Sequence, residues 1–258
     1  MGYDRIFPFS ICLSYPAQGT GKRGRALRIR RFLVVTLAAS AAFAAGAVPA
    51  RASSSYEVAY WAMDEPGGAR VMHDSSGHGL DGRIGSEVGT GGGYRFARLD
   101  PDTPPPHPRH LVVVPDSDAL DPGTRTFQVT LRLRTLFHFG NVVQKGQATV
   151  PGGSWKVQIP NGHVQCWFRG SAGEVLVTAP RAVNDGRWHT ISCTRWSDGV
   201  TLSIDGTKVA GRWGATGTIA NSWPLSIGGK TVCDQRSVGC DYYAGDLGSV
   251  RIDASDTW

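Results

Sequence analysis

Residues 154–169, SWKVQIPNGHVQCWFR, contain two alternating runs separated by an Asn-Gly step. The first run places Trp155, Val157 and Ile159 on one face, and the second run, HVQCWFR, alternates in the same way. Apolar and polar residues that alternate with a period of two are typical of a β-strand with one buried face. Asn-Gly is the strongest short hairpin signal, because both residues tolerate a positive φ. This stretch therefore predicts a two-stranded antiparallel hairpin.

Similar short runs, separated by turn residues, fill most of the chain after residue 52. They are YEVAYWAM (56–63), GYRFARL (93–99), HLVVV (110–114), TFQVTLRLRT (126–135), EVLVT (174–178), the run from Trp188 to Trp196, VTLSI (200–204), PLSIGG (224–229) and YAGDLGSVRI (243–252). No convincing amphipathic helix accompanies them. Many short strands with frequent turn signals predict one all-β domain, a two-sheet sandwich or a barrel.

The N-terminal 52 residues have a different character. Residues 22–31, KRGRALRIRR, are strongly basic and lead into an apolar run that ends at Ala50-Arg51-Ala52. A basic segment, an apolar segment and an A-x-A site predict a secretory signal peptide; the alternative is a retained membrane anchor. We expect an extension plus signal peptide over 1–52, cleavage near Ser53, and one secreted domain over 53–258 without stable membrane insertion.

Removing that leader changes the charge of the protein. The whole chain has 27 basic and 21 acidic side chains, whereas residues 53–258 have 19 and 20. A nearly neutral domain has no overall field that would attract nucleic acid or an anionic membrane. We therefore expect neither as a partner.

The leader also removes Cys12 and leaves an even set of four cysteines: Cys166, Cys193, Cys233 and Cys240. An even set in an exported chain indicates two disulfides. Cys166 and Cys193 each lie on the core-facing parity of a strand, in two strands that could be neighbours, and Cys233 and Cys240 bracket a hairpin-sized loop. We predict the pairs Cys166–Cys193 and Cys233–Cys240.

Five motifs in order carry a family resemblance: AYWAMDE (59–65), HDSSGHGLDG (73–82), DGRWHTISCTR with GVTLSIDG (185–206), PLSIGGK (224–230) and YYAGDLGSVRI (242–252). Together they resemble the laminin-G-like, concanavalin A-like jelly roll of secreted actinobacterial proteins. The resemblance implies a sandwich of two antiparallel sheets. It also implies that Trp188 and His189 begin a structural strand, with His189 packed and hydrogen-bonded instead of acting as a base.

Catalytic motifs are missing from the sequence. Glycosidases of this fold use two carboxylates, about 5 to 5.5 Å apart in retaining enzymes. Glu57, Glu65, Glu87 and Glu174 have no acidic partner at the spacing that would place both on one strand face. A G-x-S-x-G elbow and an H-E-x-x-H zinc site are also absent. We expect a protein that is not an enzyme, and a glycoside-active enzyme ranks third among the functional hypotheses.

The loop HDSSGHGLDG is a candidate Ca²⁺ site, with Asp74 and Asp81 as ligands. Tightly turned, oxygen-rich loops suit this ion, and the resemblance implies calcium at the position of Asp74. The sequence departs from the family at Gly248, where relatives commonly have an aspartate. The alternative is an Asx-turn in which Asp74 caps its own backbone.

The strand face opposite Cys166 carries Gln165, Trp167 and Arg169, an aromatic ring between two hydrogen-bonding groups. Such a combination suits the stacking and reading of a sugar. Trp223, Tyr242 and Tyr243 lie near expected loops and are further candidates; packing under a loop is the alternative for each. We expect a non-catalytic recognition module for carbohydrate or a cell-surface glycan. The alternative is an extracellular domain that binds protein.

Overall fold

The computed structural model describes residues 54–99, 106–148, 150–233 and 239–256. The expected signal peptide lies outside the described residues. In the part that is described, no helix has the length and apolar character needed to cross a membrane.

Fifteen strands and two short 3-10 helices make up the described chain. They are β1 Ser55–Trp61, β2 Val71–Met72, β3 Gly82–Ile84, β4 Tyr94–Phe96, η1 Pro108–His110, β5 Val112–Val114, η2 Asp118–Leu120, β6 Thr126–Arg134, β7 Asn141–Lys145, β8 Ser154–Gln158, β9 His163–Gly170, β10 Gly173–Ala182, β11 His189–Arg195, β12 Gly199–Ile204, β13 Thr207–Trp213, β14 Leu225–Ile227 and β15 Gly245–Ser255.

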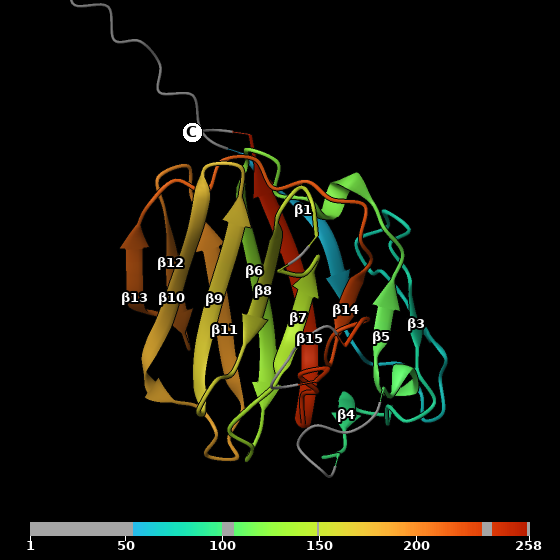
Figure 1. Ribbon diagram of the computed structural model, residues 1–258. Helices are drawn as coiled ribbons and strands as arrows, with labels where there is room; N and C mark the ends of the chain where they lie inside the picture. Colours follow the sequence, from blue (N-terminus) through green and yellow to red (C-terminus); the bar gives the residue numbers. More distant parts are fainter. Residues whose placement is uncertain (1–53, 100–105, 149, 234–238, 257–258) are drawn as a thin grey trace, which may run out of the picture. The chain divides into compact units, whose positions relative to one another are not determined.

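The strands form two antiparallel sheets that pack face to face (Figure 1). The seven-stranded sheet has the order β1-β15-β6-β11-β12-β13, and β4 pairs with β15. The eight-stranded sheet has the order β10-β9-β8-β7-β14-β5-β3-β2. The expected all-β, two-sheet jelly-roll sandwich is confirmed.

The core follows from the alternation in the sequence. Along β6, Phe127, Val129, Leu131 and Leu133 are buried, whereas the residues between them face outward. From the opposite sheet, Trp155 packs on Phe127 with ring centroids 5.5 Å apart. Two inner faces filled in this way keep the two sheets together, because apolar area is removed from water on both.

The hairpin that the Asn-Gly step predicts joins β8 to β9. Asn161 has a φ of 53° and Gly162 a φ of 80°, as a tight turn of this type requires. Counting outward from the turn, Lys156 lies opposite Trp167. The turn therefore fixes which side chains of β8 accompany those of β9.

Both predicted disulfides are present. Cys166 and Cys193 are fully buried with their Cα atoms 5.7 Å apart. The sequence analysis treated their strands as possible neighbours. In the structure the two strands belong to different sheets. This bridge therefore crosses the core. The Cα atoms of Cys233 and Cys240 are 4.3 Å apart, across a separation of seven residues.

Four strands were not expected from the sequence: β2, β3, β7 and β13. All five residues of β7 are buried, so no polar residue marks a solvent face. β2 and β3 are only two and three residues long. β13 lies at a sheet edge and has no fully buried residue. β2 and β3 are too short, and β7 and β13 do not alternate, so none of the four shows the pattern by which a half-buried strand is identified.

Candidate functional site

The outer face of β8, β9 and β10 carries three rows of side chains, most of them partly exposed. Residues directly opposite in antiparallel strands share a face, so the register defines these rows. From β10 through β9 to β8, the rows are Glu174, Arg169 and Ser154; Leu176, Trp167 and Lys156; and Thr178, Gln165 and Gln158. The parity predicted for Gln165, Trp167 and Arg169 is confirmed, since all three are half-buried and alternate with buried residues.

Trp167 lies in the middle row, held by a charged side chain on each side. The ammonium of Lys156 lies 4.6 Å from the centre of the indole ring. The indole Nε1 donates a hydrogen bond of 3.1 Å to the Glu174 carboxylate. These contacts fix the orientation of the ring, which stays partly exposed.

Hydrogen bonds also position the two neighbours of Trp167. Gln165 accepts from the side-chain amide of Gln158 and donates to the Thr178 hydroxyl at 2.9 Å. Arg169 donates through one terminal nitrogen to the carbonyls of Gln147 and Val150 at 3.1 and 3.2 Å. The polar groups are therefore pre-ordered around the ring, which lowers the entropic cost of binding.

A hollow of about 740 Å³ begins at the Arg169 and Glu174 end of this face. Its remaining lining is mostly backbone of the glycine-rich segments 150–153 and 170–173. Next to it, the Arg169 Nε and the Ser154 Oγ are buried without a hydrogen-bond partner among the described residues. Buried polar atoms are normally paired, so these two are exceptions close to the end of the open face.

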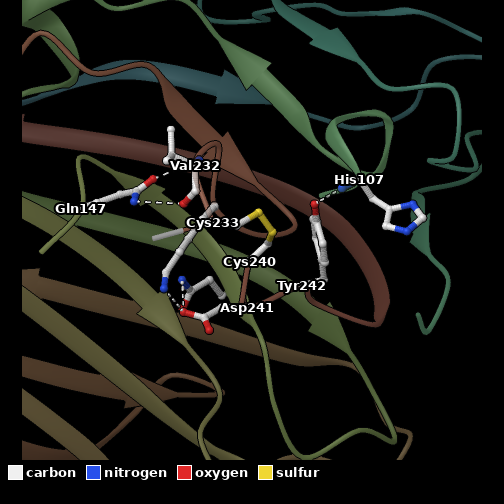
Figure 2. The surroundings of a disulfide bond; sticks show 9 residues. His107, Gln147, Val232, Cys233, Cys240, Asp241 and Tyr242 are labelled. Atoms are coloured by element: carbon white, nitrogen blue, oxygen red, sulfur yellow. Dashed lines mark hydrogen bonds and ion pairs between the residues drawn. A yellow bond between two sulfur atoms is a disulfide. The ribbon is translucent and has the colours of Figure 1, made fainter. Parts of the chain in front are cut away.

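Next to β8, both ends of β7 are contacted by the described residues on either side of the Cys233–Cys240 bridge (Figure 2). The backbone of Val232 exchanges two hydrogen bonds with the Gln147 side chain, just after β7. At the start of β7, Asn141 donates to the Asp241 carboxylate at 3.2 Å, and Lys230 pairs with the same carboxylate at 2.7 Å. Between these two anchors, the outward-facing Gln144 is only 2% exposed. The open part of the eight-stranded sheet therefore lies on β8, β9 and β10.

The three aromatic residues expected near loops do not join Trp167. Trp223 is half-buried and donates from Nε1 to the Thr231 hydroxyl at 3.1 Å. Tyr242 accepts from the backbone amide of His107 and stacks edgewise on it (Figure 2). Tyr243 is 1% exposed and belongs to the core, which leaves no ring face for a ligand. For Tyr243, the packing interpretation replaces the binding one.

The loop with Asp74 and Asp81 is organised by hydrogen bonds. One oxygen of Asp74 accepts from the amides of Tyr60 and Ser76 and from the Ser76 hydroxyl, and the other accepts from the Leu80 amide. Burial raises the pKa of Asp74, but these bonds outweigh it and the net pKa is lowered. One oxygen of Asp81 caps the Asp74 amide at 2.8 Å.

This donor set does not fit a Ca²⁺ ion, because N–H and O–H donors occupy the Asp74 oxygens that would bind it. Among the described residues, no three His, Cys, Asp or Glu side chains converge as ligands. Gly248 lies elsewhere: a Cβ there would be 3.3 Å from Arg132 and 3.5 Å from Trp188. The arrangement is that of an Asx-turn, and calcium binding stays a prediction to be tested.

His189 begins β11 and contacts two carboxylates. Its Nδ1 lies 2.8 Å from Asp205 and its Nε2 lies 3.1 Å from Asp185. Partial burial lowers the pKa of His189, but the two aspartates outweigh it and the net pKa is raised. Both ring nitrogens are occupied, as expected of a structural histidine. The guanidinium groups of Arg132 and Arg134 cover the ring of Trp188 at 4.3 and 4.8 Å.

A comparison with protein families gives a match over residues 110–254 to the family model Laminin_G_3, described as concanavalin A-like lectin/glucanases superfamily. The chain belongs to this superfamily. The matched stretch contains β5 to β14 and nearly all of β15, and therefore the complete face around Trp167. No curated protein sequence matches the chain.

Solved structures share the superfamily fold at low identity. Domain 4 of AbnA, an extracellular arabinanase of family GH43 from Geobacillus stearothermophilus in complex with arabinotriose, matches with a TM-score of 0.53 and 15% identity over 78% of this chain and 93% of that one. The binding domain of Paraclostridial Mosquitocidal Protein 1 matches with a TM-score of 0.53 and 12% identity, over 77% of this chain and 48% of that one. Domains LG4-5 of the mouse laminin alpha1 chain match with a TM-score of 0.46 and 18% identity, over 57% of this chain and 40% of that one. The chain thus spans less than half of the last two structures.

Among the residues of the open face that the sequence analysis did not single out are Lys156, Gln158, Glu174 and Leu176. A signal for two of them was present. Counting outward from the Asn161-Gly162 turn places Gln158 opposite Gln165 and Lys156 opposite Trp167. The two β10 residues depend on the register after the turn at residues 170–173, which the sequence defines less sharply.

Proposed function

We propose that this chain is a secreted, non-catalytic recognition module that binds carbohydrate on the open face around Trp167. The observation that carries the proposal is a half-exposed indole ring that is oriented by Lys156 and Glu174 and flanked by Gln165 and Arg169. An aromatic platform between hydrogen-bonding side chains matches a sugar, which has an apolar ring face and hydroxyl groups at its edge.

Secretion is supported by the disulfides. Two bridges within one domain are typical of an oxidising compartment outside the cytosol. The leader expected over residues 1–52 agrees with this location.

The absence of catalysis is also a proposal, and the partners of the glutamates support it. Each glutamate contacts a structural group: Glu57 with Arg251 at 3.2 Å, Glu65 with Tyr94 at 2.6 Å, Glu87 with Arg109 at 3.2 Å, and Glu174 with Trp167 at 3.1 Å. A retaining glycosidase needs two carboxylates that both face the substrate. Glu174 is the one glutamate on the open face rows described above, and it lies there without a second carboxylate.

Affinity gel electrophoresis of residues 53–258 with soluble polysaccharides tests this function. Linear arabinan, arabinoxylan, mixed-linkage β-glucan and galactomannan form the panel; arabinan is included because the arabinanase domain of the same fold binds arabinotriose. We expect retardation by at least one polymer and clearly weaker retardation of Trp167→Ala. Trp223→Ala is the matched control, because it removes another half-buried indole that lies outside the open face.

Two results would contradict the proposal. If folded Trp167→Ala binds as well as the wild type, the carbohydrate site lies elsewhere. If the wild type binds no glycan in the panel or on a glycan array, the alternative of an extracellular protein-binding domain is favoured. Release of reducing sugar from any polymer would show catalysis.

A further inference from the structure

Two tryptophans remain exposed on the seven-stranded sheet, away from Trp167. Trp213 at the end of β13 is 82% exposed, and Trp196 just after β11 is 45% exposed. Both line one hollow of about 480 Å³, together with Thr201 and Gly211. Large aromatic side chains are rarely left in water, so two of them at one hollow require an explanation.

A second hollow of about 580 Å³ lies on the other side of Trp196. Trp196 lines both hollows, so the two hollows adjoin at this ring, and together they are called the groove. The Nε1 of Trp196 donates to the Thr201 hydroxyl at 3.2 Å, which fixes the indole at this position. The groove therefore has a defined aromatic ridge in the middle and a second ring at its end.

The floor of the groove consists of two rungs that cross the sheet from β15 to β13. The register gives the first rung as Asp253, Gln128, Thr194, Thr201 and Gly211. It gives the second as Arg251, Thr130, Ser192, Ser203 and Lys208. Five strands at a spacing of about 4.8 Å make each rung roughly 19 Å long, enough for several sugar units in an extended chain.

Side-chain hydrogen bonds already order the centre of this floor. The Thr194 hydroxyl donates to the side-chain oxygen Oε1 of Gln128 at 2.9 Å. The side-chain nitrogen Nε2 of Gln128 donates to the Thr130 hydroxyl at 3.1 Å. Thr130 in turn lies 3.2 Å from the Ser192 hydroxyl. A hydroxyl has two acceptor lone pairs and a primary amide has two N–H groups, so each member keeps capacity for a ligand.

The charges of the groove lie at its two ends: the Arg251–Asp253 pair at one end, and Asp198, Lys208 and Arg212 in the hollow beside Trp213 at the other. Arg251 forms a bidentate pair with Asp253, with distances from 2.7 to 3.0 Å. The central side chains, from Gln128 to Thr201, are uncharged. This uncharged centre suits a chain of hydroxyl groups better than a phosphate or a sulfate, because hydroxyls exchange hydrogen bonds there without bringing an unpaired charge onto the floor.

We propose that the groove running from the Arg251–Asp253 pair over Trp196 to Trp213 binds a neutral polysaccharide chain. The two indole rings stack on sugar faces, and the Gln, Thr and Ser side chains between β15 and β12 accept and donate hydrogen bonds to hydroxyls. The site lies on the sheet opposite Trp167, and it rests on the proposed function only for the class of its ligand. One domain then presents two glycan sites on opposite faces and joins two polymer chains.

Affinity gel electrophoresis with the same four neutral polysaccharides tests the groove. We expect Trp196→Ala and Trp213→Ala each to weaken binding of a retained polymer roughly 3- to 10-fold, the range that aromatic contacts of this kind provide. Trp196→Phe and Trp213→Phe keep a ring and retain most of the affinity. The combination of Trp167→Ala and Trp213→Ala binds more weakly than either single variant.

Turbidity of a polysaccharide solution gives a second readout of two sites. The wild type cross-links chains and raises the turbidity, whereas Trp167→Ala and Trp213→Ala each reduce this rise, because each variant weakens one of the two sites. Thermal melting of both variants is expected to match that of the wild type, since both rings are at least partly exposed. This separates loss of binding from loss of fold.

The outcomes distinguish the two proposals. Unchanged affinity in both Trp196→Ala and Trp213→Ala overturns the groove, whatever the result for Trp167→Ala. A loss of affinity in Trp167→Ala, with no loss in the two groove variants, supports the proposed function and overturns the proposal of a groove site. Stronger, salt-sensitive binding of polygalacturonate than of neutral polymers overturns the ligand class. A wild-type dimer that Trp213→Ala converts to monomer, with glycan binding intact, assigns Trp213 to self-association and overturns the groove.

Discussion

Removal of the bridge between Cys166 and Cys193 is the change whose effect on stability follows most directly from the structure. The two residues are 27 positions apart, are fully buried, and join the two sheets through the core. The second bridge closes a loop with a separation of only seven residues, and Cys233 is partly exposed. The double variants Cys166→Ala/Cys193→Ala and Cys233→Ala/Cys240→Ala each leave the other bridge intact and introduce no free thiol.

The chain-entropy model gives the sizes of the two effects. A loop of 27 residues corresponds to about 3.5 kcal/mol at 25 °C, and one of seven residues to about 2.4 kcal/mol. For a domain of this size, 1 kcal/mol shifts the melting temperature by roughly 2 to 4 °C. We therefore expect a decrease of about 7 to 14 °C for the Cys166 pair and about 5 to 10 °C for the Cys233 pair. Loss of buried sulfur adds to the first value.

Urea unfolding followed by tryptophan fluorescence measures both free energies. Thiol titration and intact mass of the exported wild type provide the control, with no reactive thiol and a start near Ser53 expected. Equal destabilisation by the two double variants, or a larger effect of the Cys233 pair, would refute the argument that loop length and core burial decide the contribution of each bridge.

Two further changes test single side chains. Asp74→Ala is expected to cost about 1 to 3 kcal/mol in calcium and in chelator alike, because it removes four hydrogen bonds. A wild-type melting temperature that rises with CaCl2, and a variant in which it does not, would instead support a bound ion. For His189, the pKa in the folded state lies above its ordinary value of 6.5 owing to Asp185 and Asp205. The contribution of His189 to the free energy of unfolding is therefore complete below about pH 6.5 and is lost as the pH rises through the folded-state pKa. The stability difference between the wild type and His189→Gln, measured by urea unfolding, should shrink from pH 5.5 to pH 9, and a constant difference would contradict this.

Local patterns were sufficient for much of the fold and for one face of the candidate site. The Asn161-Gly162 turn and the alternation around it predict β8, β9 and the outward parity of Trp167. These features depend on neighbours in sequence, since a turn needs a positive φ and a strand reverses its side chains at every residue. The same parity identified Cys166 and Cys193 as core-facing and hence as partners.

Long-range packing decided the rest. Parity states that a side chain leaves the core, but only the arrangement of distant segments determines whether another layer covers it. Gln144 and Trp167 both face outward, yet the first lies between the contacts on either side of the Cys233–Cys240 bridge and is buried, whereas the second stays partly exposed. Tyr243 lies in the core although it is next to the half-buried Tyr242. Trp213 is exposed because β13 ends the sheet and no further strand covers it, a position that hydrogen bonding between strands sets and periodicity does not encode.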